Sequence, residues 1–517
     1  MTPHVYPREC AFKSIEDIKG KKVTIMGLGL NGGGEAAVRF FVNKGAHVTI
    51  TDMKTEQQLA ATIDRLENDP NLNMENVIWR LGEHRIEDFA NADCVIKNPG
   101  VKIEGNKFLA AARAIESDLS IFLRFTDCPI IAVTGSKGKS STVSAIYYGL
   151  KEAGYKAFLG GNITVSPLTF FDQVNADTPV VIEFSSWQLA DLRGRGVLRP
   201  HIALITKIVP DHQNWYGNMK DYVADKQLIY ADQTRGDYSI FDADGDQPGT
   251  GPEGAETWGQ LFASETRGTV LRYSRTGLKD GQYGVWLEEE KGSDGAVNVV
   301  GKIRLPQMEG AETIMKGLSV PGEHMRTNVL NAALVMYLMG VPAERCAEIC
   351  GRWQGIDHRL QYFHSWIAPD GTVYKFYNDS CATVPEAAAA ASQSFGKSVI
   401  LMTGGTDKGL DLAPLERILT APDTSRGEFP VKELYLLAGS ATDKLLPALN
   451  KAGVKYHGPF NSLEELLQEA KANAQKKSRE EVFVFSPGAT SFGMFQNEFD
   501  RGNKYMAAVK ALFAPKS

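Results

Sequence analysis

The strongest chemical signal in the sequence is a glycine-rich stretch, Thr134–Thr142 (TGSKGKSST), between an apolar run and a helical pattern. Small residues let backbone N–H groups curl around a phosphate, and the N-terminus of the following helix adds partial positive charge. Lys139 is placed to reach the β- and γ-phosphates of a nucleotide, and the Ser140 hydroxyl is placed to ligate Mg²⁺. The spacing GxxGKS is shorter than the usual GxxxxGK[ST] form, so the string alone also fits a structural turn. The flanking strand and helix favour a nucleotide site.

Polar residues follow later apolar runs, at the strand ends where open α/β sheets bind ligands. Glu183 ends one apolar run and has a carboxylate suited to Mg²⁺. Asp211 and His212 end another run, and Lys226 lies in a helical pattern, YVADKQLIY. Taken singly, each of these residues equally fits a cap, a hydrogen-bond partner or a solvated helix face. Their joint occurrence after a phosphate loop favours a functional site.

A second glycine-rich string, GLGLNG at Gly27–Gly32, follows the first predicted strand. Asp52 ends the next strand, at the distance where a dinucleotide fold places the acid that binds a ribose hydroxyl. An NAD-dependent oxidoreductase is therefore an alternative function from another class. The phosphate loop near residue 135 has no role in hydride transfer, which counts against this alternative.

Apolar strand-like runs alternate with helical patterns along most of the chain, which predicts an α/β fold with parallel sheets. We expect three domains, at residues 1–128, 129–354 and 355–517, with a polar, glycine-rich insertion or small β excursion near 242–312. The predicted strands are Lys22–Met26, Val48–Thr51, Cys94–Lys97, Pro129–Thr134, Pro179–Ile182, His201–Thr206, Thr372–Tyr377, Ser398–Met402, Glu433–Ala438 and Glu481–Phe485, and the predicted helices include Gly34–Lys44, Pro385–Ser394 and Leu463–Ala474.

Composition and charge exclude several classes of protein. The chain has 517 residues and a net charge of −6, which disfavours nucleic-acid binding because that needs clustered positive charge. There is no run of eighteen apolar residues and no secretory signal pattern, so we expect no membrane segment and a cytoplasmic location. Six cysteines without a CxxC pair fit reduced thiols. The oligomeric state cannot be predicted from the sequence.

The order of these motifs resembles that of the Mur ligase family, most closely its members that add glutamate to UDP-N-acetylmuramoyl-L-alanine. The resemblance covers most of the chain outside residues 242–312, and motifs in family order are much more specific than any one of them. The matching stretches are GLGLNG at Gly27, TGSKGKS at Thr134, GGNI at Gly160, EFSSWQL at Glu183, PDH at Pro210, ADKQLIY at Ala224, PGEHMRTN at Pro321, GIDHRLQ at Gly355, NDSCAT at Asn378, GGTDKGLDL at Gly404 and SPGATSFGMFQNEFDRGNKY at Ser486.

The resemblance implies a Rossmann-like N-terminal domain for the UDP moiety, a central P-loop ATPase-like domain and a Rossmann-like C-terminal domain for the amino acid. It also implies the chemistry. ATP phosphorylates the carboxylate of UDP-N-acetylmuramoyl-L-alanine, and the amine of an amino acid, expected to be glutamate, attacks the acyl phosphate. This reaction serves peptidoglycan precursor synthesis and uses ATP and Mg²⁺, with two metal sites expected.

The resemblance also implies residue roles. Lys226 matches a lysine that is carbamylated in the family, a change that turns a cation into an anionic metal ligand. The implied catalytic residues are Lys139, Asp211, His212 and Lys226, and the implied metal ligands are Ser140, Glu183, His212 and Lys226. The implied ATP-binding residues are Gly135, Ser136, Lys137, Gly138, Lys139, Ser140, Ser141, Asn328 and Arg359. The implied UDP-substrate residues are Gly29, Leu30, Asn31, Asp52, Asn162, Ser185, Ser186 and Gln188, and the implied amino-acid residues are Thr383, Lys408 and Ser491.

The sequence departs from the family pattern at two positions. Cys381 stands where the family motif NDSKAT has lysine, so the amino-acid pocket loses a cation that would pair with a glutamate carboxylate. Met325 stands where asparagine is common, while Asn328 is present. Ligase chemistry with L-glutamate or another amino acid is therefore an alternative, and a nucleotide-binding protein without catalysis is a further one. The retained Lys139, Glu183, His212 and Lys226 count against a nucleotide-binding protein without catalysis.

Overall fold

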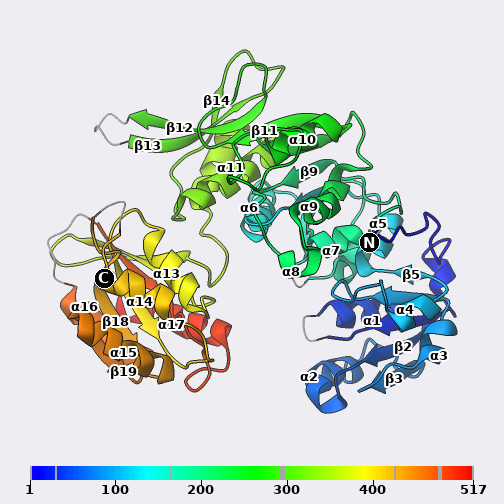
Figure 1. Ribbon diagram of the computed structural model, residues 1–517, viewed down its shortest axis with the longest axis horizontal. Coiled ribbons are helices and arrows are strands. Elements are labelled where there is room, and N and C mark those ends of the chain that lie inside the picture. The colour runs from blue at the N-terminus through cyan, green and yellow to red at the C-terminus, as the bar shows by residue number, and fades with distance from the viewer. Residues whose placement is uncertain are drawn as a thin grey trace. The chain divides into compact units, whose positions relative to one another are not determined.

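The computed structural model describes residues 3–29, 32–163, 165–291, 297–423, 427–474 and 480–514. Their strands form three sheets, coloured blue, cyan to green, and yellow to red in Figure 1. This arrangement confirms the predicted α/β fold class. By contacts between residues the chain forms two compact units, 1–316 with 327–350, and 317–326 with 351–517. The predicted boundary at 128/129 lies inside the first unit, and the three-domain division stays a prediction.

The first sheet is parallel throughout, with the strand order β3-β2-β1-β4-β5. Its central strand β1 has the sequence KVTIM, of which the last four residues are buried, as the apolar run predicts. The strands are β1 (Lys22–Met26), β2 (His47–Asp52), β3 (Val77–Leu81), β4 (Cys94–Lys97) and β5 (Ile115–Glu116). The helices are α1 (Gly33–Asn43), α2 (Glu56–Glu67), α3 (Ile86–Ala90), α4 (Lys107–Ala111) and α5 (Asp118–Phe125).

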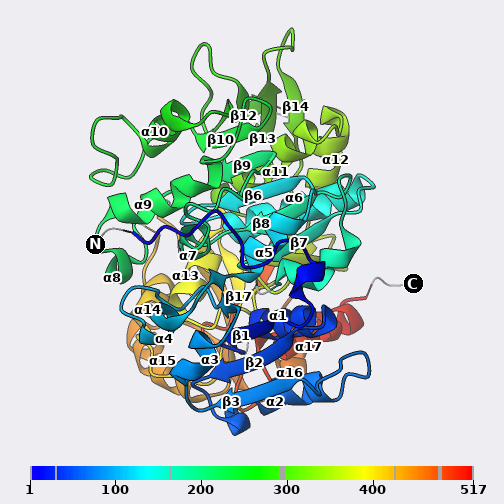
Figure 2. The ribbon, with the colours of Figure 1, turned by 90° about the vertical axis from the view of Figure 1, so that its right-hand side faces the viewer.

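The second sheet has the order β14-β13-β12-β11-β10-β9-β6-β8-β7 and is parallel from β7 to β12. Figure 2 shows β8, β6 and β9 side by side. The strands are β6 (Ile130–Thr134), β7 (Phe158–Gly161), β8 (Val180–Glu183), β9 (Ile202–Ile205), β10 (Tyr238–Asp242), β11 (Thr269–Ser274), β12 (Gly284–Lys291), β13 (Val297–Arg304) and β14 (Glu312–Met315). The helices are α6 (Lys139–Glu152), α7 (Ser186–Ala190), α8 (Gln213–Tyr216), α9 (Met219–Gln227), α10 (Trp258–Glu265), α11 (Glu323–Leu338) and α12 (Ala343–Arg352).

The described residues between 242 and 312 form a β excursion that continues this second sheet. Strands β11 and β12 extend its parallel part, and β13 and β14 complete it with antiparallel pairs. The segment also buries Trp258, Phe262 and Val285. It therefore contributes to the core as well as to the surface, although its polar, glycine-rich loops dominate its composition.

One hydrophobic cluster explains why the first two sheets share a compact unit. It includes Val23 and Ile25 from β1 together with Ala132 from β6 and Ile182 from β8. Burial of a continuous apolar cluster stabilises both sheets at once, because every apolar surface in it is removed from water. None of the helices in the described ranges combines the length and hydropathy needed to span a bilayer.

The third sheet, in the second unit, has the order β15-β16-β20-β17-β18-β19. All its pairs are parallel except that of β15 with β16, and hydrophobic clusters cover its two faces. The strands are β15 (Gln361–Ile367), β16 (Val373–Asn378), β17 (Val399–Gly404), β18 (Val431–Leu437), β19 (His457–Phe460) and β20 (Glu480–Phe485). The helices are α13 (Pro385–Gln393), α14 (Ala413–Thr420), α15 (Ser440–Ala452), α16 (Leu463–Asn473) and α17 (Glu498–Leu512).

Candidate functional site

The glycine-rich loop connects β6 to the N-terminus of α6, as the sequence predicts. Gly135 and Gly138 have φ values of 142° and 95°, which favour glycine. A Cβ on Gly135 would lie 2.0 Å from Oγ1 of Thr206, and a Cβ on Gly138 would lie 2.5 Å from Oδ1 of Asn328. Neither position therefore accepts a side chain. The loop delivers the first N–H groups of α6, which have no carbonyl partner within the helix, to one point.

Two lysines converge on this loop. Lys139 Nζ donates to the carbonyl oxygens of Gly135 and Ser136 at 3.0 and 3.1 Å, and Lys226 Nζ donates to Gly135 O at 2.9 Å. Lys226 is only 2% exposed. Burial, reinforced by the charge of Lys139, lowers the pKa of Lys226 to about 7. Burial also lowers the pKa of Lys139. The site thus holds a lysine that is partly neutral near pH 7.

Glu183 ends β8 beside the phosphate loop and is 1% exposed. Its Oε1 accepts a hydrogen bond from Nδ2 of Asn162 at 2.9 Å. Its Oε2 is buried and has no hydrogen-bond partner among the residues that the structure describes. A buried carboxylate oxygen without a partner is costly in a folded protein, and a bound cation would satisfy it.

Asp211 and His212 lie in the loop after β9. The Asp211 carboxylate lies 3.5 Å from Nζ of Lys137, and the charges of Lys137 and His212 outweigh burial and lower its pKa. His212 has a φ of 50° and packs its ring against Trp187, with ring centroids 5.1 Å apart. Within the described ranges, no group of three or more His, Cys, Asp or Glu side chains could hold a metal. A metal here would need ligands of other kinds, such as a hydroxyl, a modified lysine or a substrate oxygen.

The predicted substrate residues Ser185, Ser186 and Gln188 lie at the start of α7, one strand away from the phosphate loop. Ser185 and Gln188 form a capping box, in which Ser185 Oγ accepts from Gln188 N at 3.2 Å and Gln188 Oε1 accepts from Ser185 N at 2.9 Å. This pairing fixes the first turn of the helix. Ser186, the first residue of α7, is buried.

Asp52 holds the glycine-rich turn of the first sheet. Its Oδ2 accepts from Gly29 N at 3.0 Å, and its Oδ1 accepts from Lys54 N at 2.9 Å. The carboxylate is therefore used within the chain, at the position where the sequence predicts a ligand contact. The predicted substrate residues Leu30 and Asn31 lie outside the described residues.

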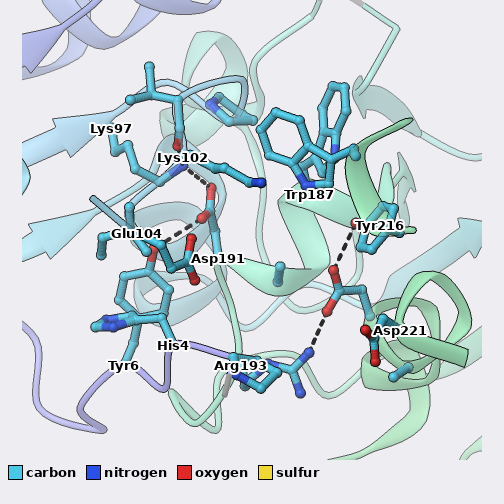
Figure 3. A pocket seen from close by; sticks show the side chains of 18 residues that line it. His4, Tyr6, Lys97, Lys102, Glu104, Trp187, Asp191, Arg193, Tyr216 and Asp221 are labelled. Carbon is cyan, nitrogen blue, oxygen red and sulfur yellow. Dashed lines mark hydrogen bonds and ion pairs between the residues drawn. The ribbon is translucent and has the colours of Figure 1, made fainter. Parts of the chain in front are cut away.

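A cavity of about 340 Å³ lies beside α7, α8 and α9, and Pro3, His4 and Tyr6 contribute to its wall (Figure 3). Asp191 in its wall pairs with Lys97 at 2.8 Å and accepts from Tyr6 Oη at 3.0 Å. Asp225, next to Lys226 in α9, pairs with Arg193 and accepts from Tyr216 Oη at 2.8 Å. These pairings fix the ends of the helices that carry the site residues.

The predicted amino-acid residues follow adjacent parallel strands of the second unit. Thr383, Lys408 and Ser491 come after β16, β17 and β20, which are neighbours in the sheet. The strand ends are joined by Thr490 N, which donates to Thr406 O at 3.0 Å. The three residues therefore come to one sheet edge, as their positions after strands predict.

The same edge carries a titratable group that the sequence analysis did not single out. Asp379, directly after β16, accepts from Ser486 Oγ at 2.6 Å and from Leu360 N at 3.0 Å. Burial raises its pKa to about 7. Its place at a strand end, inside the NDSCAT motif, was the available signal. Nearby, burial raises the pKa of the Cys381 thiol, and the charge of exposed Arg359 opposes that shift.

Comparison with known proteins gives consistent matches. Residues 133–336 match the family model "Mur ligase middle domain", and residues 21–118 match "Mur ligase MurD-like, N-terminal domain". The chain is 39% identical to the UDP-N-acetylmuramoylalanine--D-glutamate ligase of Treponema pallidum (strain Nichols), over 96% of this chain and 98% of that protein. It is 35% identical to the protein of the same name from Borreliella burgdorferi (strain ZS7), over 96% and 99% of the two chains.

Solved structures show the same fold at lower sequence identity. The UDP-N-acetylmuramate-alanine ligase MurC of Thermotoga maritima matches with a TM-score of 0.52 and 18% identity, over 95% of this chain and 100% of that one. MurF of Acinetobacter baumannii matches with a TM-score of 0.50 and 16% identity, over 74% and 77% of the two chains.

Proposed function

Because this chain belongs to the Mur ligase family, we propose that it is an ATP-dependent ligase that joins D-glutamate to UDP-N-acetylmuramoyl-L-alanine. The two relatives described above carry this activity in their names and align along nearly their whole length. The observation that carries the proposal is the convergence of Lys139 and Lys226 on the phosphate loop, beside a carboxylate oxygen of Glu183 that has no hydrogen-bond partner among the described residues.

The reaction requires activation of a carboxylate, because the oxide of a free carboxylate is a poor leaving group. A carboxylate oxygen of the muramoyl substrate attacks the γ-phosphorus of ATP, forming an acyl phosphate and releasing ADP. The amine of glutamate then attacks the acyl carbon, the C–O bond to phosphate breaks, and the amide forms with loss of one proton. Lys139 exchanges its contacts with the Gly135 and Ser136 carbonyls for the transferred phosphoryl group, whose charge it offsets.

The residues present fit a magnesium ion, since Glu183 presents beside the phosphate loop a buried oxygen that no described residue hydrogen-bonds. Ser140, Glu183 and His212 would hold Mg²⁺, together with a carbamylated Lys226, at two sites. The bound metal would offset negative charge on the phosphoryl group. The described residues include no cluster of three His, Cys, Asp or Glu side chains that could hold a metal. Carbamylation of Lys226 would add an anionic metal ligand to this site.

The environment of Lys226 favours carbamylation. The reaction joins the neutral amine to CO₂, forms an N–C bond and releases one proton. A pKa of about 7 leaves a substantial neutral fraction at physiological pH, which an exposed lysine lacks. A crystal structure of the ligand-bound protein with unmodified Lys226 far from any metal would contradict this assignment.

The remaining predicted contacts divide between the two units. We assign the UDP substrate to the first unit and the amino acid to the second. The residues assigned to ATP are those of the phosphate loop, Asn328 and Arg359. The residues assigned to the UDP substrate are Gly29, Leu30, Asn31, Asp52, Asn162, Ser185, Ser186 and Gln188. Those assigned to the amino acid are Thr383, Lys408 and Ser491. We also propose the three-domain division and a cytoplasmic location.

A phosphate-release assay with UDP-N-acetylmuramoyl-L-alanine, ATP and a panel of amino acids tests the proposal. We expect release that requires both the nucleotide substrate and D-glutamate. Faster turnover with L-glutamate than with D-glutamate would make L-glutamate the substrate. Equal rates with neutral amino acids would exclude specificity for glutamate. For the NAD alternative, the discriminating measurement is thermal unfolding. The UDP substrate should raise the melting temperature, and NAD should leave it unchanged.

A further inference from the structure

The backbone that supports the phosphate loop comes from residues 206–209, which follow β9. The Lys207 carbonyl oxygen accepts two loop N–H groups, from Ser136 at 2.9 Å and from Lys137 at 3.3 Å. Ser136 Oγ donates to Val209 O at 2.8 Å and accepts from Val209 N at 3.1 Å. The course of the loop over Ser136 and Lys137 is therefore set by where residues 206–209 lie.

The Lys207 side chain joins these residues to the end of β10. Its Nζ donates to Asp242 Oδ2 at 2.9 Å and to Gly245 O at 2.8 Å. The side chain of Lys207 is 33% exposed and that of Asp242 is 14% exposed. A partly buried, doubly bonded ammonium is a stronger link than an exposed surface pair.

The partner loop, residues 242–246, is itself fixed. Asp244 accepts from Ser274 Oγ at 2.7 Å and from Arg275 Nε at 3.0 Å, and Asp246 accepts from Trp258 N at 2.8 Å. Its acidic side chains are thus matched by donors within the chain. The loop is a firm support, anchored to β11 and α10, rather than an open cation site.

We propose that Lys207 is a positioning residue for nucleotide binding: by joining residues 206–209 to the 242–246 loop, it fixes the carbonyl that shapes the phosphate loop. The inference rests on the proposed function of that loop in binding ATP. The proposal also gives the start of the 242–312 segment a role in nucleotide binding, because Asp242 and Gly245 accept hydrogen bonds from Lys207.

If Lys207 instead bound a phosphate of the nucleotide directly, the Asp242→Asn substitution would have the opposite effect on nucleotide binding. If Lys207 left Asp242 to bind a phosphate directly, Asp242→Asn would free the lysine and would preserve or strengthen nucleotide binding. If Lys207 acts by anchoring, Asp242→Asn weakens the anchor and nucleotide binding falls. The two roles are therefore separable by one substitution.

The experiment compares Lys207→Met, Lys207→Arg, Asp242→Asn and the Lys207→Met/Asp242→Asn double variant with the wild type. Lys279→Met is the matched control, because Lys279 forms an exposed pair with Glu256, 3.9 Å apart, in the same region. ADP binding in the presence of Mg²⁺ is measured by calorimetry. The KM values for ATP and for UDP-N-acetylmuramoyl-L-alanine are measured in the ligase assay.

We expect Lys207→Met to raise the ADP Kd and the KM for ATP by about tenfold, with the KM for the UDP substrate unchanged. Asp242→Asn should act in the same direction, the double variant should lose no more than Lys207→Met, and Lys207→Arg should restore most of the affinity. Lys279→Met should match the wild type. A purely structural role would reduce the active fraction and leave both KM values and the ADP Kd unchanged.

Unchanged ADP affinity in Lys207→Met, or preserved affinity in Asp242→Asn, would overturn the inference. If Lys207→Met fails to fold, Asp242→Asn and Lys207→Arg still decide it. The experiment separates this inference from the proposed function. If the wild type shows no ligase turnover, the proposed function fails, but the ADP affinities of the variants can still be compared.

Discussion

The ammonium groups of Lys139 and Lys226 share one acceptor, the carbonyl oxygen of Gly135, at 3.0 and 2.9 Å. Two cations on one backbone oxygen repel each other, which helps lower the pKa of Lys226. The arrangement places one lysine to meet a phosphoryl group and leaves the other partly neutral. Burial of Lys226, together with this shared contact, separates the roles of the two lysines.

Replacing Lys139 tests the first of these roles. Lys139→Ala should reduce ATP-dependent phosphate release by at least about 10³-fold, because it removes the cation assigned to offset the charge of the transferred group. Binding of the UDP substrate, measured by calorimetry, should remain within about threefold. Lys151→Ala, in the last turn of the same helix, is the control and should retain full turnover. Ligase turnover that persists in Lys139→Ala would refute the assignment.

A second prediction concerns the shape of the loop. Gly138→Ala places a Cβ 2.5 Å from Oδ1 of Asn328 at a φ of 95°, so the backbone is strained and either the Asn328 carboxamide or the loop must shift. ATP affinity should fall by about tenfold or more. Gly154→Ala is the matched control, since Gly154 has a φ of 96° beyond the other end of α6 and its added Cβ would meet nothing within 4 Å. Equal ATP affinities in the two variants would contradict this prediction, because Gly154 lies at the far end of α6 from the loop.

Much of the fold could be predicted because buried parallel strands are short apolar runs. All ten strands and all three helices named from the sequence occur, with bounds within a few residues. The sequence does not predict β3, β5, β7, β10, β15, β19 or the strands β11 to β14. In β12 the last four residues, Glu288 to Lys291, are exposed, and in β13 the first two, Val297 and Asn298, are exposed, so neither strand is a buried apolar run. The single sequence could place residues at strand ends but could not show how Asp52, Ser185 and Gln188 are used, because their partners are backbone groups and capping contacts.

A pH dependence should follow from Asp379. Burial raises its folded-state pKa to about 7, above its ordinary value of 3.8. The folded state therefore holds a proton that the unfolded state has lost between pH 4 and 7, so the contribution of this group to stability is present at low pH and is lost as the pH rises through 7. Asp379→Asn removes this loss of stability at high pH, because the amide does not titrate. The amide can keep the hydrogen bonds with Ser486 Oγ and Leu360 N.

The melting temperature of Asp379→Asn should accordingly equal that of the wild type near pH 4 and exceed it by several degrees at pH 8. Scanning calorimetry across this range provides the measurement. A difference between the two proteins that stays constant with pH would contradict the buried, raised-pKa carboxyl.

Cys381 provides a prediction about specificity. Cys381→Lys adds a cation near Arg359, at the sheet edge assigned to the amino acid. We expect the ratio of kcat/KM for glutamate over that for glutamine to rise by about fivefold or more. Cys381→Ser adds no charge and should leave the ratio within about twofold of the wild-type value. The phosphate-release assay with both amino acids measures it. An unchanged ratio in Cys381→Lys would place this position outside the pocket.

The central claim, that ATP activates a carboxylate of the sugar-nucleotide, is tested most directly by isotope transfer. UDP-N-acetylmuramoyl-L-alanine labelled with ¹⁸O in both oxygens of its alanyl carboxylate is incubated with ATP, Mg²⁺, D-glutamate and the protein. If an acyl phosphate forms, the amide keeps one labelled oxygen and the released phosphate carries the other, so mass spectrometry should find one ¹⁸O per phosphate. Phosphate that carries no label while the amide forms would contradict the account.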